Sequence, residues 1–212
     1  MKRSGGWEYW EDKAANFDKW NERIVGKETE SQLNSWLQTK ISMDDSVLDL
    51  GCGTGRYSMI IAKTGAQLIS ADQSPAMLEE TRKKLSDLGN TCVQREDCFD
   101  TSFMDSSFDV VFMGNLLHIV KSPEDAVREA FRILKPGGKF LAIDYTSMGM
   151  SGIAILRMIF TILTTWGLPS KDNRVLTPED VSKMATDEGF TVKQAELMGP
   201  STKAVCLHAE KN

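Results

Sequence analysis

The sequence predicts an α/β protein with a doubly wound, largely parallel sheet. Short apolar strands alternate with helical segments between residues 45 and 146, which is the pattern of repeated βα units. The first strand runs directly into a glycine-rich turn that opens a helix. The length of 212 residues, with 41% hydrophobic and 26% charged residues, fits a single globular domain that buries a core of ordinary size.

Residues 1–44 are predicted to form an amphipathic helical cap. Trp10, Ala14, Phe17 and Ile24 recur at helical spacing, with charged residues between them. Four of the five tryptophans lie in this region: Trp7, Trp10, Trp20 and Trp36. The helix either packs on the core or forms an aromatic flap over a site.

Residues 45–146 are predicted to form the ligand-binding core. Its strands are expected at 47–50, 67–71, 91–95, 108–113 and 139–145. Its helices are expected at 57–62, 75–88 and 123–134. Ser74 and Ser122 each precede a proline, which is typical of a helix start, and Gly89 is expected to end the second helix. Residues 135–138 have the composition of a turn.

An apolar helical insertion is expected at 147–175, after the fifth strand. Between residues 147 and 168 the only charge is Arg157, beside three methionines. Three interpretations of this insertion are open. It forms a lid over an apolar ligand, it forms a dimer face or plain core helix, or it lies on a membrane surface. A single arginine provides no basic polar face for the last of these.

Residues 176–212 are predicted to form a terminal helix and a strand pair. The helix starts near Thr177 and stops at Gly189. The strands 190–197 and 203–209 are separated by a hairpin-length connection, so we expect them to be antiparallel.

The overall charge and the cysteines narrow the class of protein. A net charge of −5 and a pI near 5.2 argue against nucleic acid as the main partner. The four cysteines have neither zinc-site spacing nor the density of a disulfide framework, so no metal site and a reducing, cytoplasmic location are expected. They are Cys52, Cys92, Cys98 and Cys206. Neither a signal peptide nor a membrane-spanning run is indicated.

The glycine-rich turn has the pattern Asp49-x-Gly-x-Gly-x-Gly55. Arg56 stands where the dinucleotide fingerprint requires its third glycine, and no Lys-Ser or Lys-Thr follows as in a P-loop. Asp72 ends the second strand, 21 positions beyond Gly51, where a carboxylate can accept hydrogen bonds from two ribose hydroxyls. Asp97 follows the third strand and is suited to accept a hydrogen bond from an adenine amino group.

These motifs resemble those of the class I S-adenosylmethionine-dependent methyltransferases. The matching landmarks, in order, are Asp49-Leu-Gly-Cys-Gly-Thr-Gly55, Asp72 with Ser74-Pro75 and Met77, Asp97, Phe108-Asp-Val-Val111, and Arg132-Ile-Leu-Lys-Pro-Gly-Gly138. The nearest group is the small-molecule enzymes that include ubiquinone and menaquinone biosynthesis methyltransferases. The resemblance covers about residues 45–146. It implies a Rossmann-like seven-stranded sheet with an antiparallel last strand and helices on both faces, and S-adenosyl-L-methionine as cofactor, with S-adenosyl-L-homocysteine as product.

The resemblance also implies which residues bind the cofactor. The set is Asp49, Gly51, Cys52, Gly53, Thr54, Gly55, Asp72, Gln73, Met77, Asp97, Cys98, Met113, Gly114 and Asn115. The turn would surround the methionine part of the cofactor, and Asp72 would bind the ribose hydroxyls. The adenine would be contacted by Gln73, Met77, Asp97 and Cys98. Residues 113–115 would line the methyl-transfer side, although relatives often carry Ser-Asn where this chain has Met113-Gly114. Met77 is equally compatible with a core position, and the two cysteines with packing.

Catalytic candidates are few, because the sulfonium of the cofactor is already a good leaving group. A base is needed only when the acceptor holds a proton. His118 is the candidate base, or a packing residue. Asp144 and Tyr145, at the end of the fifth strand, are candidates for substrate contact, or for structural roles. No metal is indicated.

The expected acceptor is a small molecule, with apolar or aromatic compounds among the candidates. The chain lacks the Asn-Pro-Pro-Tyr, Asp-Pro-Pro-Tyr and Pro-Cys motifs of nucleic-acid base methyltransferases. The methylated atom and the oligomeric state, with a dimer possible, stay open. One alternative function is a nicotinamide-dependent oxidoreductase, which Arg56 disfavours. Another is a non-catalytic cofactor-binding module, which the intact glycine turn and Asp72 disfavour.

Overall fold

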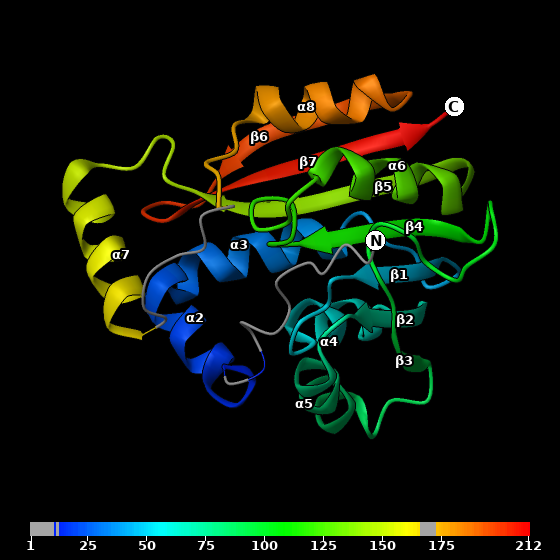
Figure 1. Cartoon of the computed structure of the whole chain (residues 1–212), viewed down its shortest axis with the longest axis horizontal. Helices are drawn as coiled ribbons and strands as arrows, with labels where there is room; N and C mark the ends of the chain where they lie inside the picture. The colour runs from blue at the N-terminus through cyan, green and yellow to red at the C-terminus, as the bar shows by residue number, and fades with distance from the viewer. Residues whose placement is uncertain (1–10, 12, 166–172) are drawn as a thin grey trace.

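The computed structural model describes residue 11, residues 13–165 and residues 173–212. Trp7, Trp10 and Trp166 lie outside the described residues. Seven strands form one sheet in the order β3-β2-β1-β4-β5-β7-β6 (Figure 1). The strands are β1 (Ser46–Leu50), β2 (Gln67–Asp72), β3 (Thr91–Arg95), β4 (Phe108–Gly114), β5 (Leu134–Thr146), β6 (Phe190–Met198) and β7 (Lys203–Lys211).

Strand directions confirm the predicted α/β sheet. The pairs β1–β2, β1–β4, β2–β3 and β4–β5 are parallel, whereas β7 is antiparallel to both β5 and β6. The central strands are buried on both faces, which explains why they are continuous apolar runs in the sequence. The last strand of the chain therefore lies between β5 and β6 and not at an edge of the sheet.

Helices cover both faces of the sheet (Figure 1). On one face α3 (Lys27–Gln38), α4 (Arg56–Ala62) and α5 (Pro75–Leu85) pack through residues such as Leu37 and Ile61. On the other face α6 (Pro123–Ile133) and α8 (Pro178–Asp187) pack through residues such as Ile133 and Val181. Side chains of β5 alternate between the two faces, which decides where its last residues point.

The N-terminal region contains separate helices where one was predicted. A 3₁₀ turn, η1 (Ala14–Asn16), leads into α2 (Phe17–Val25), and α3 follows. Gly26 separates α2 from α3 with a φ of 81°, a conformation that interrupts the helix. Thr29 Oγ1 donates to the carbonyl of Thr202, and Thr202 Oγ1 donates to the carbonyl of Ile24, which fixes this corner to the β6–β7 connection.

Two predicted boundaries are wrong for local reasons. The predicted turn at 135–138 is an irregularity inside β5, since Phe108 pairs with Leu134 but Val110 pairs with Lys139. Gly137 has a φ of 76° there, so the turn residues form a bulge that the strand continues through. The helix expected to reach residue 88 ends at Leu85. Ser86 and Asp87 follow it, and both residue types favour a helix interior less than the Lys and Leu before them.

The insertion after β5 contains α7 (Gly152–Thr165), which packs against α2. Its outer side chains Ile153, Leu156 and Phe160 are 85%, 73% and 70% exposed. These exposures rule out a plain core helix. In the described part of the chain, no helix is both long and apolar enough to cross a membrane.

Candidate active site

The carboxyl ends of β1, β2, β4 and β5 meet at one edge of the sheet (Figure 1). Parallel α/β sheets bind ligands at this edge, where the strand order reverses. The strand order here reverses at β1, so the crevice between the loops after β1 and β4 is the expected position. The predicted site residues from the glycine turn to Tyr145 all follow or end these strands, or belong to the loop after β3 and the start of α5.

Different structural requirements explain why glycine occupies each of the three positions of the turn. A Cβ on Gly51 would lie 2.7 Å from Leu116 Cδ1, and one on Gly55 would lie 2.9 Å from Thr81 Cγ2. A Cβ on Gly53 would meet nothing within 4 Å, although its φ of 54° also favours glycine. Packing therefore accounts for Gly51 and Gly55, whereas Gly53 leaves open space in which a ligand can approach the backbone.

Asp72 connects the end of β2 to the glycine turn. Its Oδ2 accepts a hydrogen bond from Gly53 N and its Oδ1 accepts one from Ser74 N, both at 2.9 Å. Each carboxylate oxygen keeps a lone pair for another donor. Burial raises the pKa of Asp72 above its usual value against the lowering effect of these backbone bonds, and nearby Glu11 raises it further.

Asp49 is the most deeply buried acid of the turn region, with 1% of its surface exposed. Its Oδ2 accepts a 2.6 Å hydrogen bond from Ser58 Oγ on α4. Burial raises the pKa of Asp49 to about 7, and the nearby charge of Asp72 adds to this effect. A cationic group bound at this edge would favour the ionised form of Asp49.

Several predicted cofactor residues can offer only part of their structure to a ligand. Met77 and Met113 are 3% and 0% exposed, so both side chains belong to the interior. Burial raises the pKa of the Cys52 and Cys98 thiols, which keeps both in the unreactive thiol form. The Gln73 carbonyl accepts a hydrogen bond from Arg95 Nε at 2.9 Å.

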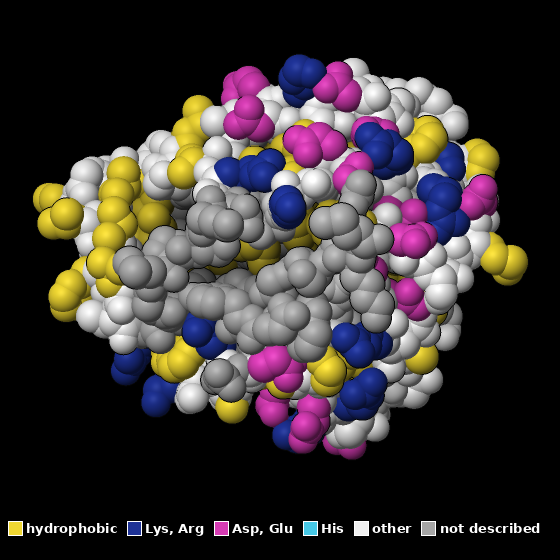
Figure 2. All heavy atoms as spheres, viewed as in Figure 1, with side chains coloured by type: hydrophobic (Ala, Val, Ile, Leu, Met, Phe, Trp, Pro, Cys, Tyr) yellow, Lys and Arg dark blue, Asp and Glu magenta, His cyan; other side chains and the backbone are white. Residues whose placement is uncertain are grey.

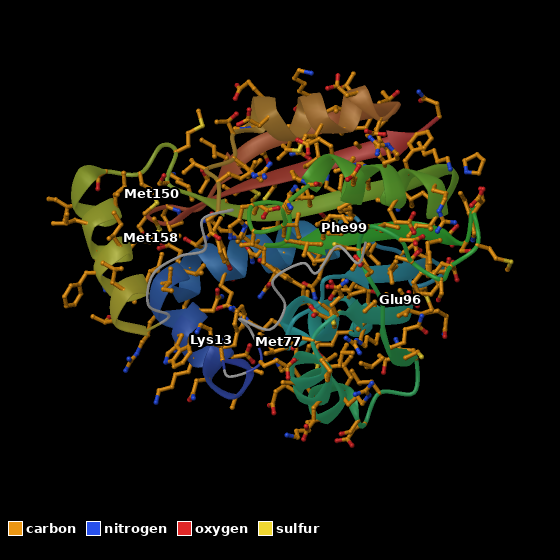
Figure 3. The ribbon with its side chains drawn as sticks, viewed as in Figure 1. Lys13, Met77, Glu96, Phe99, Met150 and Met158 are labelled. Carbon is orange, nitrogen blue, oxygen red and sulfur yellow. The ribbon has the colours of Figure 1, made fainter. Side chains whose placement is uncertain are left out.

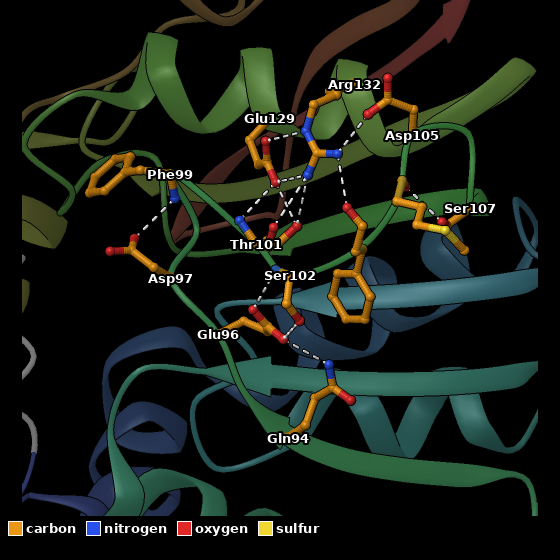
Figure 4. Close-up of polar contacts among 12 residues, drawn as sticks. Gln94, Glu96, Asp97, Phe99, Thr101, Ser102, Asp105, Ser107, Glu129 and Arg132 are labelled. Carbon is orange, nitrogen blue, oxygen red and sulfur yellow. Dashed lines mark hydrogen bonds and ion pairs between the residues drawn. The ribbon is translucent and has the colours of Figure 1, made fainter.

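Asp97 belongs to a loop held by a polar network (Figure 4). Glu129 accepts hydrogen bonds from Thr101 N and Oγ1, and Arg132 contacts both Glu129 and the carbonyl of Phe103. Asp97 Oδ1 accepts a hydrogen bond from Phe99 N at 3.0 Å.

Glu96, the acid next to Asp97 in the sequence, accepts hydrogen bonds from Ser102 N and Oγ within the same loop. It points toward the network, whereas Asp97 lies outside it (Figure 4). The Glu96 carboxylate accepts three hydrogen bonds within this region and that of Asp97 accepts one, so Asp97 has more bonding capacity left for a ligand.

The residues after β4 are shaped by packing. A Cβ on Gly114 would lie 2.6 Å from Tyr57 Cδ2, so this position requires glycine. Asn115 has a φ of 57°, donates from its N to the Ile143 carbonyl and accepts at Oδ1 from Tyr145 N. The side chain of Asn115 thus joins the ends of β4 and β5.

The three catalytic candidates separate into two groups. His118 Nδ1 lies 2.6 Å from Asp144 Oδ1, and the His118 backbone N donates to the same oxygen. Tyr145, the next residue on β5, faces the α3 and α4 side of the sheet. Its hydroxyl lies 3.5 Å from Asn21 Nδ2, and the neighbouring charge of Arg56 partly offsets the pKa increase that burial causes.

The N-terminal helices contact the glycine turn through polar groups that sequence reasoning missed. Thr54 Oγ1 donates to Asp18 Oδ1 at 2.6 Å, and Lys84 Nζ contacts Asp18 Oδ2 at 2.5 Å. Ser74 Oγ donates to Glu11 Oε1 at 2.6 Å. Asp18 lies in the first turn of α2, whereas Glu11 precedes η1, so helical spacing in the sequence could not have grouped these two acids.

The insertion flanks the same edge of the sheet. Figure 2 shows hydrophobic side chains gathered on the projecting α7. Met158 lies on the side of α7 that faces the rest of the molecule (Figure 3), while Leu156 and Phe160 point outward. After the insertion, Arg174 N donates to the His118 carbonyl at 3.0 Å, so the returning chain contacts the loop after β4.

Comparison with known proteins finds a family model that matches the core of the sheet. Residues 48–142 match the model of the family described as "Methyltransferase domain". This range includes the glycine turn, Asp72, Asp97 and His118. The matched segment, which is just under half of the chain, is therefore similar to the methyltransferase-domain family.

Individual proteins are similar to the same part of the chain. The chain is 35% identical over 103 residues to a demethylmenaquinone methyltransferase of Clavibacter sepedonicus, covering 49% of this chain and 42% of that protein. It is 32% identical over 145 residues to the ubiquinone/menaquinone biosynthesis C-methyltransferase UbiE of Pseudomonas savastanoi, covering 63% and 55%. The chain therefore spans about half the length of these relatives.

A solved structure shows the same fold. A chain in the complex between the Haloferax volcanii Trm112 methyltransferase activator and a putative methyltransferase has a TM-score of 0.75 at 18% identity, with 97% of each chain covered. The methyltransferase family implies S-adenosylmethionine as cofactor. The open space at Gly53 and the free lone pairs of Asp72 fit a ligand with an adenosine and a flexible chain.

Proposed function

We propose that this chain transfers the methyl group of S-adenosylmethionine to a small-molecule acceptor. The observation that carries the proposal is the junction of Gly53 and Asp72 at the carboxyl edge of the sheet. There an open backbone position and a two-oxygen acceptor are joined by a 2.9 Å hydrogen bond. When bound, the cofactor supplies a methyl group on a positively charged sulfur, whose product is a good leaving group.

The chain's own residues are proposed to bind and orient this cofactor. Asp72 accepts from the ribose hydroxyls, and the turn from Gly51 to Gly55 follows the methionine part with Asp49 beneath it. Asp97 accepts from the adenine amino group. The backbone around Gln73, Met77 and Cys98 forms the walls of the adenine site, and residues 113–115 form the methyl-transfer side. The protein contributes mainly alignment, since holding reacting groups in line removes much of the barrier.

The N-terminal helices are proposed to close the cofactor site. Asp18 and Glu11 bind Thr54 and Ser74, two hydroxyls that flank the glycine turn and the start of α5. These contacts place α2 against the loops assigned to the cofactor. Covering this edge excludes water from the transferring methyl group.

The proposed acceptor is a small molecule with apolar character. Demethylmenaquinone and ubiquinone/menaquinone appear in the names of the relatives. The segment 147–175 is proposed to serve as the acceptor-side lid, because α7 lies at the carboxyl edge and its return contacts the loop after β4. The outer stripe of α7 is apolar, which suits an apolar acceptor or a second apolar surface.

Isothermal titration calorimetry tests the cofactor. We expect S-adenosylhomocysteine to bind with a micromolar dissociation constant and NAD to give no heat. Binding of NAD alone would instead favour an oxidoreductase. Binding of S-adenosylhomocysteine without methylation of any acceptor in a broad panel, followed by mass spectrometry, would favour a non-catalytic binding module.

A further inference from the structure

His118 and Asp144 form a buried pair on the α6 and α8 face of the sheet. His118 follows β4 and Asp144 ends β5, two neighbouring parallel strands. The 2.6 Å contact joins His118 Nδ1 to Asp144 Oδ1. A carboxylate in this position accepts a hydrogen bond from Nδ1–H, which selects the neutral tautomer of the imidazole that has its lone pair on Nε2.

The imidazole is held from several segments of the chain. The His118 backbone N donates to Asp144 Oδ1, and its carbonyl accepts from Arg174 N. The guanidinium of Arg174 contacts the carbonyl of Lys121 in the same loop. The His118 side chain is 19% exposed, and the hydrogen bonds among the described residues leave its Nε2 without a partner. A fixed ring with one free nitrogen is suited to accept a proton.

Asp144 is a buried carboxylate beside this ring. The side chain of Asp144 is 1% exposed, and its buried Oδ2 has no hydrogen-bond partner among the residues that the structure describes. A buried carboxylate with an unpaired oxygen is costly unless a cation stands beside it. Protonation of His118 would create that cation at the 2.6 Å contact.

We propose that His118 Nε2 accepts a proton from the methyl acceptor, that Asp144 is its positioning residue, and that the acceptor carries a weakly acidic hydroxyl group. This inference rests on the proposed methyltransferase function. A base assists only a nucleophile that does not release its proton readily, which describes a phenol or enol and not a thiol that ionises near neutral pH.

The proton step balances within the pair and the acceptor. The acceptor O–H bond breaks and an Nε2–H bond forms, so the imidazole becomes an imidazolium facing Asp144. The oxygen keeps the electron pair of the broken bond, which makes it, or a conjugated ring carbon, the nucleophile for the methyl group. The imidazolium later gives its proton to water and the pair returns to its starting state.

Nitrogen-15 NMR of the imidazoles tests the pair without any turnover. The chain has two histidines, so His208→Gln leaves only the signals of His118. With S-adenosylhomocysteine present, we expect a protonated Nδ1 and an unprotonated Nε2. Adding Asp144→Asn should reverse the two nitrogens, because the asparagine amide can donate to Nδ1. A protonated Nε2 in the neutral ring of the starting protein, or no change in Asp144→Asn, would overturn the assignment.

A series of phenols tests the role of the base and the acceptor class. The probes are 4-nitrophenol, 4-cyanophenol and 4-methylphenol, whose hydroxyls ionise with increasing difficulty. Methylated phenol is measured by mass spectrometry, with His208→Gln as the matched control. His118→Ala should lower kcat by about 10²- to 10⁴-fold for 4-methylphenol and least for 4-nitrophenol, with KM nearly unchanged, and added imidazole should restore part of the rate.

The outcomes distinguish the two proposals. Equal loss for all three phenols, or no methylation of any of them by protein that binds S-adenosylhomocysteine, would overturn the base or the hydroxyl acceptor. Failure of the unaltered protein to bind S-adenosylhomocysteine would contradict the proposed function itself. If His118→Ala does not fold, Asp144→Asn still tests the pair, because it keeps the volume of the side chain.

Discussion

Carboxylates at the two edges of the sheet are held in opposite ways. At the amino edge, Asp109 accepts hydrogen bonds from Ser46 N and Oγ and from Lys135 Nζ, joining the starts of β1, β4 and the β5 bulge. At the carboxyl edge, Asp49 and Asp72 accept hydrogen bonds from hydroxyl and backbone donors, and no Lys or Arg among the described residues forms an ion pair with them.

The pKa shifts follow this difference. Burial opposes ionisation of Asp109, but Lys135 and Ser46 outweigh it and lower its pKa to about 2. Burial raises the pKa of Asp49 to about 7 and that of Asp72 above its usual value. At the amino edge, the charge of the carboxylate is thus balanced by a lysine. At the carboxyl edge, the acids lack such a partner and can bind a cationic or hydroxyl-rich ligand. The same residue type serves structure at one edge and, in our proposal, ligand binding at the other.

The largest expected effect is a pH-dependent stability cost from Asp49. Its pKa rises from 3.8 to about 7 on folding, so the folded state binds the extra proton and stability falls as pH rises between those values. Between pH 5 and pH 8, wild type should lose about 3 kcal/mol of unfolding free energy relative to Asp49→Asn. Urea unfolding without cofactor at both pH values measures this difference.

The Asp49 experiment directly tests the difference between the two edges of the sheet. Other titrating groups are common to both variants and cancel in the difference. A constant stability gap from pH 5 to pH 8 would mean that Asp49 is not held in a raised-pKa environment. Ser58→Ala offers a matched variant, since it removes the donor that favours ionised Asp49 and should steepen the pH dependence.

Asp72 is expected to give the next largest effect. Asp72→Ala should weaken S-adenosylhomocysteine binding by about 1.5 to 3 kcal/mol, the range for hydrogen bonds to a charged group. This corresponds to roughly a 10- to 150-fold higher dissociation constant by calorimetry. Asp87→Ala is the control, because Asp87 is exposed beyond the end of α5. A folded Asp72→Ala protein with unchanged affinity would remove Asp72 from the site.

Asp109 should give the smallest effect, on stability alone. Its lowered pKa contributes stability that is present above pH 3.8 and is lost as pH falls through about 2. The side chain is 35% exposed, so solvent screening reduces the contribution to about 1 kcal/mol. Asp109→Asn should therefore unfold about 1 kcal/mol more easily at pH 7 and bind S-adenosylhomocysteine normally.

Asp105→Asn is the matched surface control for that measurement, since Asp105 is 77% exposed in its pair with Arg132. Loss of cofactor affinity in Asp109→Asn would show that the two edges are coupled. Equal stability of both variants and wild type would show that the amino-edge network adds nothing measurable.

Local patterns in the sequence predicted most of the architecture. Alternation of apolar strands and capped helices indicated the parallel core, and the short Gly199–Thr202 connection indicated the antiparallel pair. Local composition was misleading where turn residues form the β5 bulge at 135–138, because glycine and proline also suit a bulge. It also missed that Gly26 divides the N-terminal helices.

Long-range contacts set the limit for the site. The glycine turn and Asp72 were predictable because each follows a strand at a fixed place in the sheet. Sequence alone named His118 and Asp144 without pairing them, since 26 residues separate them and only the adjacency of β4 and β5 brings them together. The two-residue alternation of β5 also separates Asp144 from Tyr145, which adjacent numbering conceals.

The position of β7 has a consequence for how the chain folds. β6 is connected to the sheet only through β7, which lies between it and β5. A nascent or truncated chain without residues 203–211 would leave the exposed edge of β5 and a detached β6 as templates for pairing with other chains. Completion of the sheet must therefore await its last strand, a nonlocal and slow event during which self-association competes with folding.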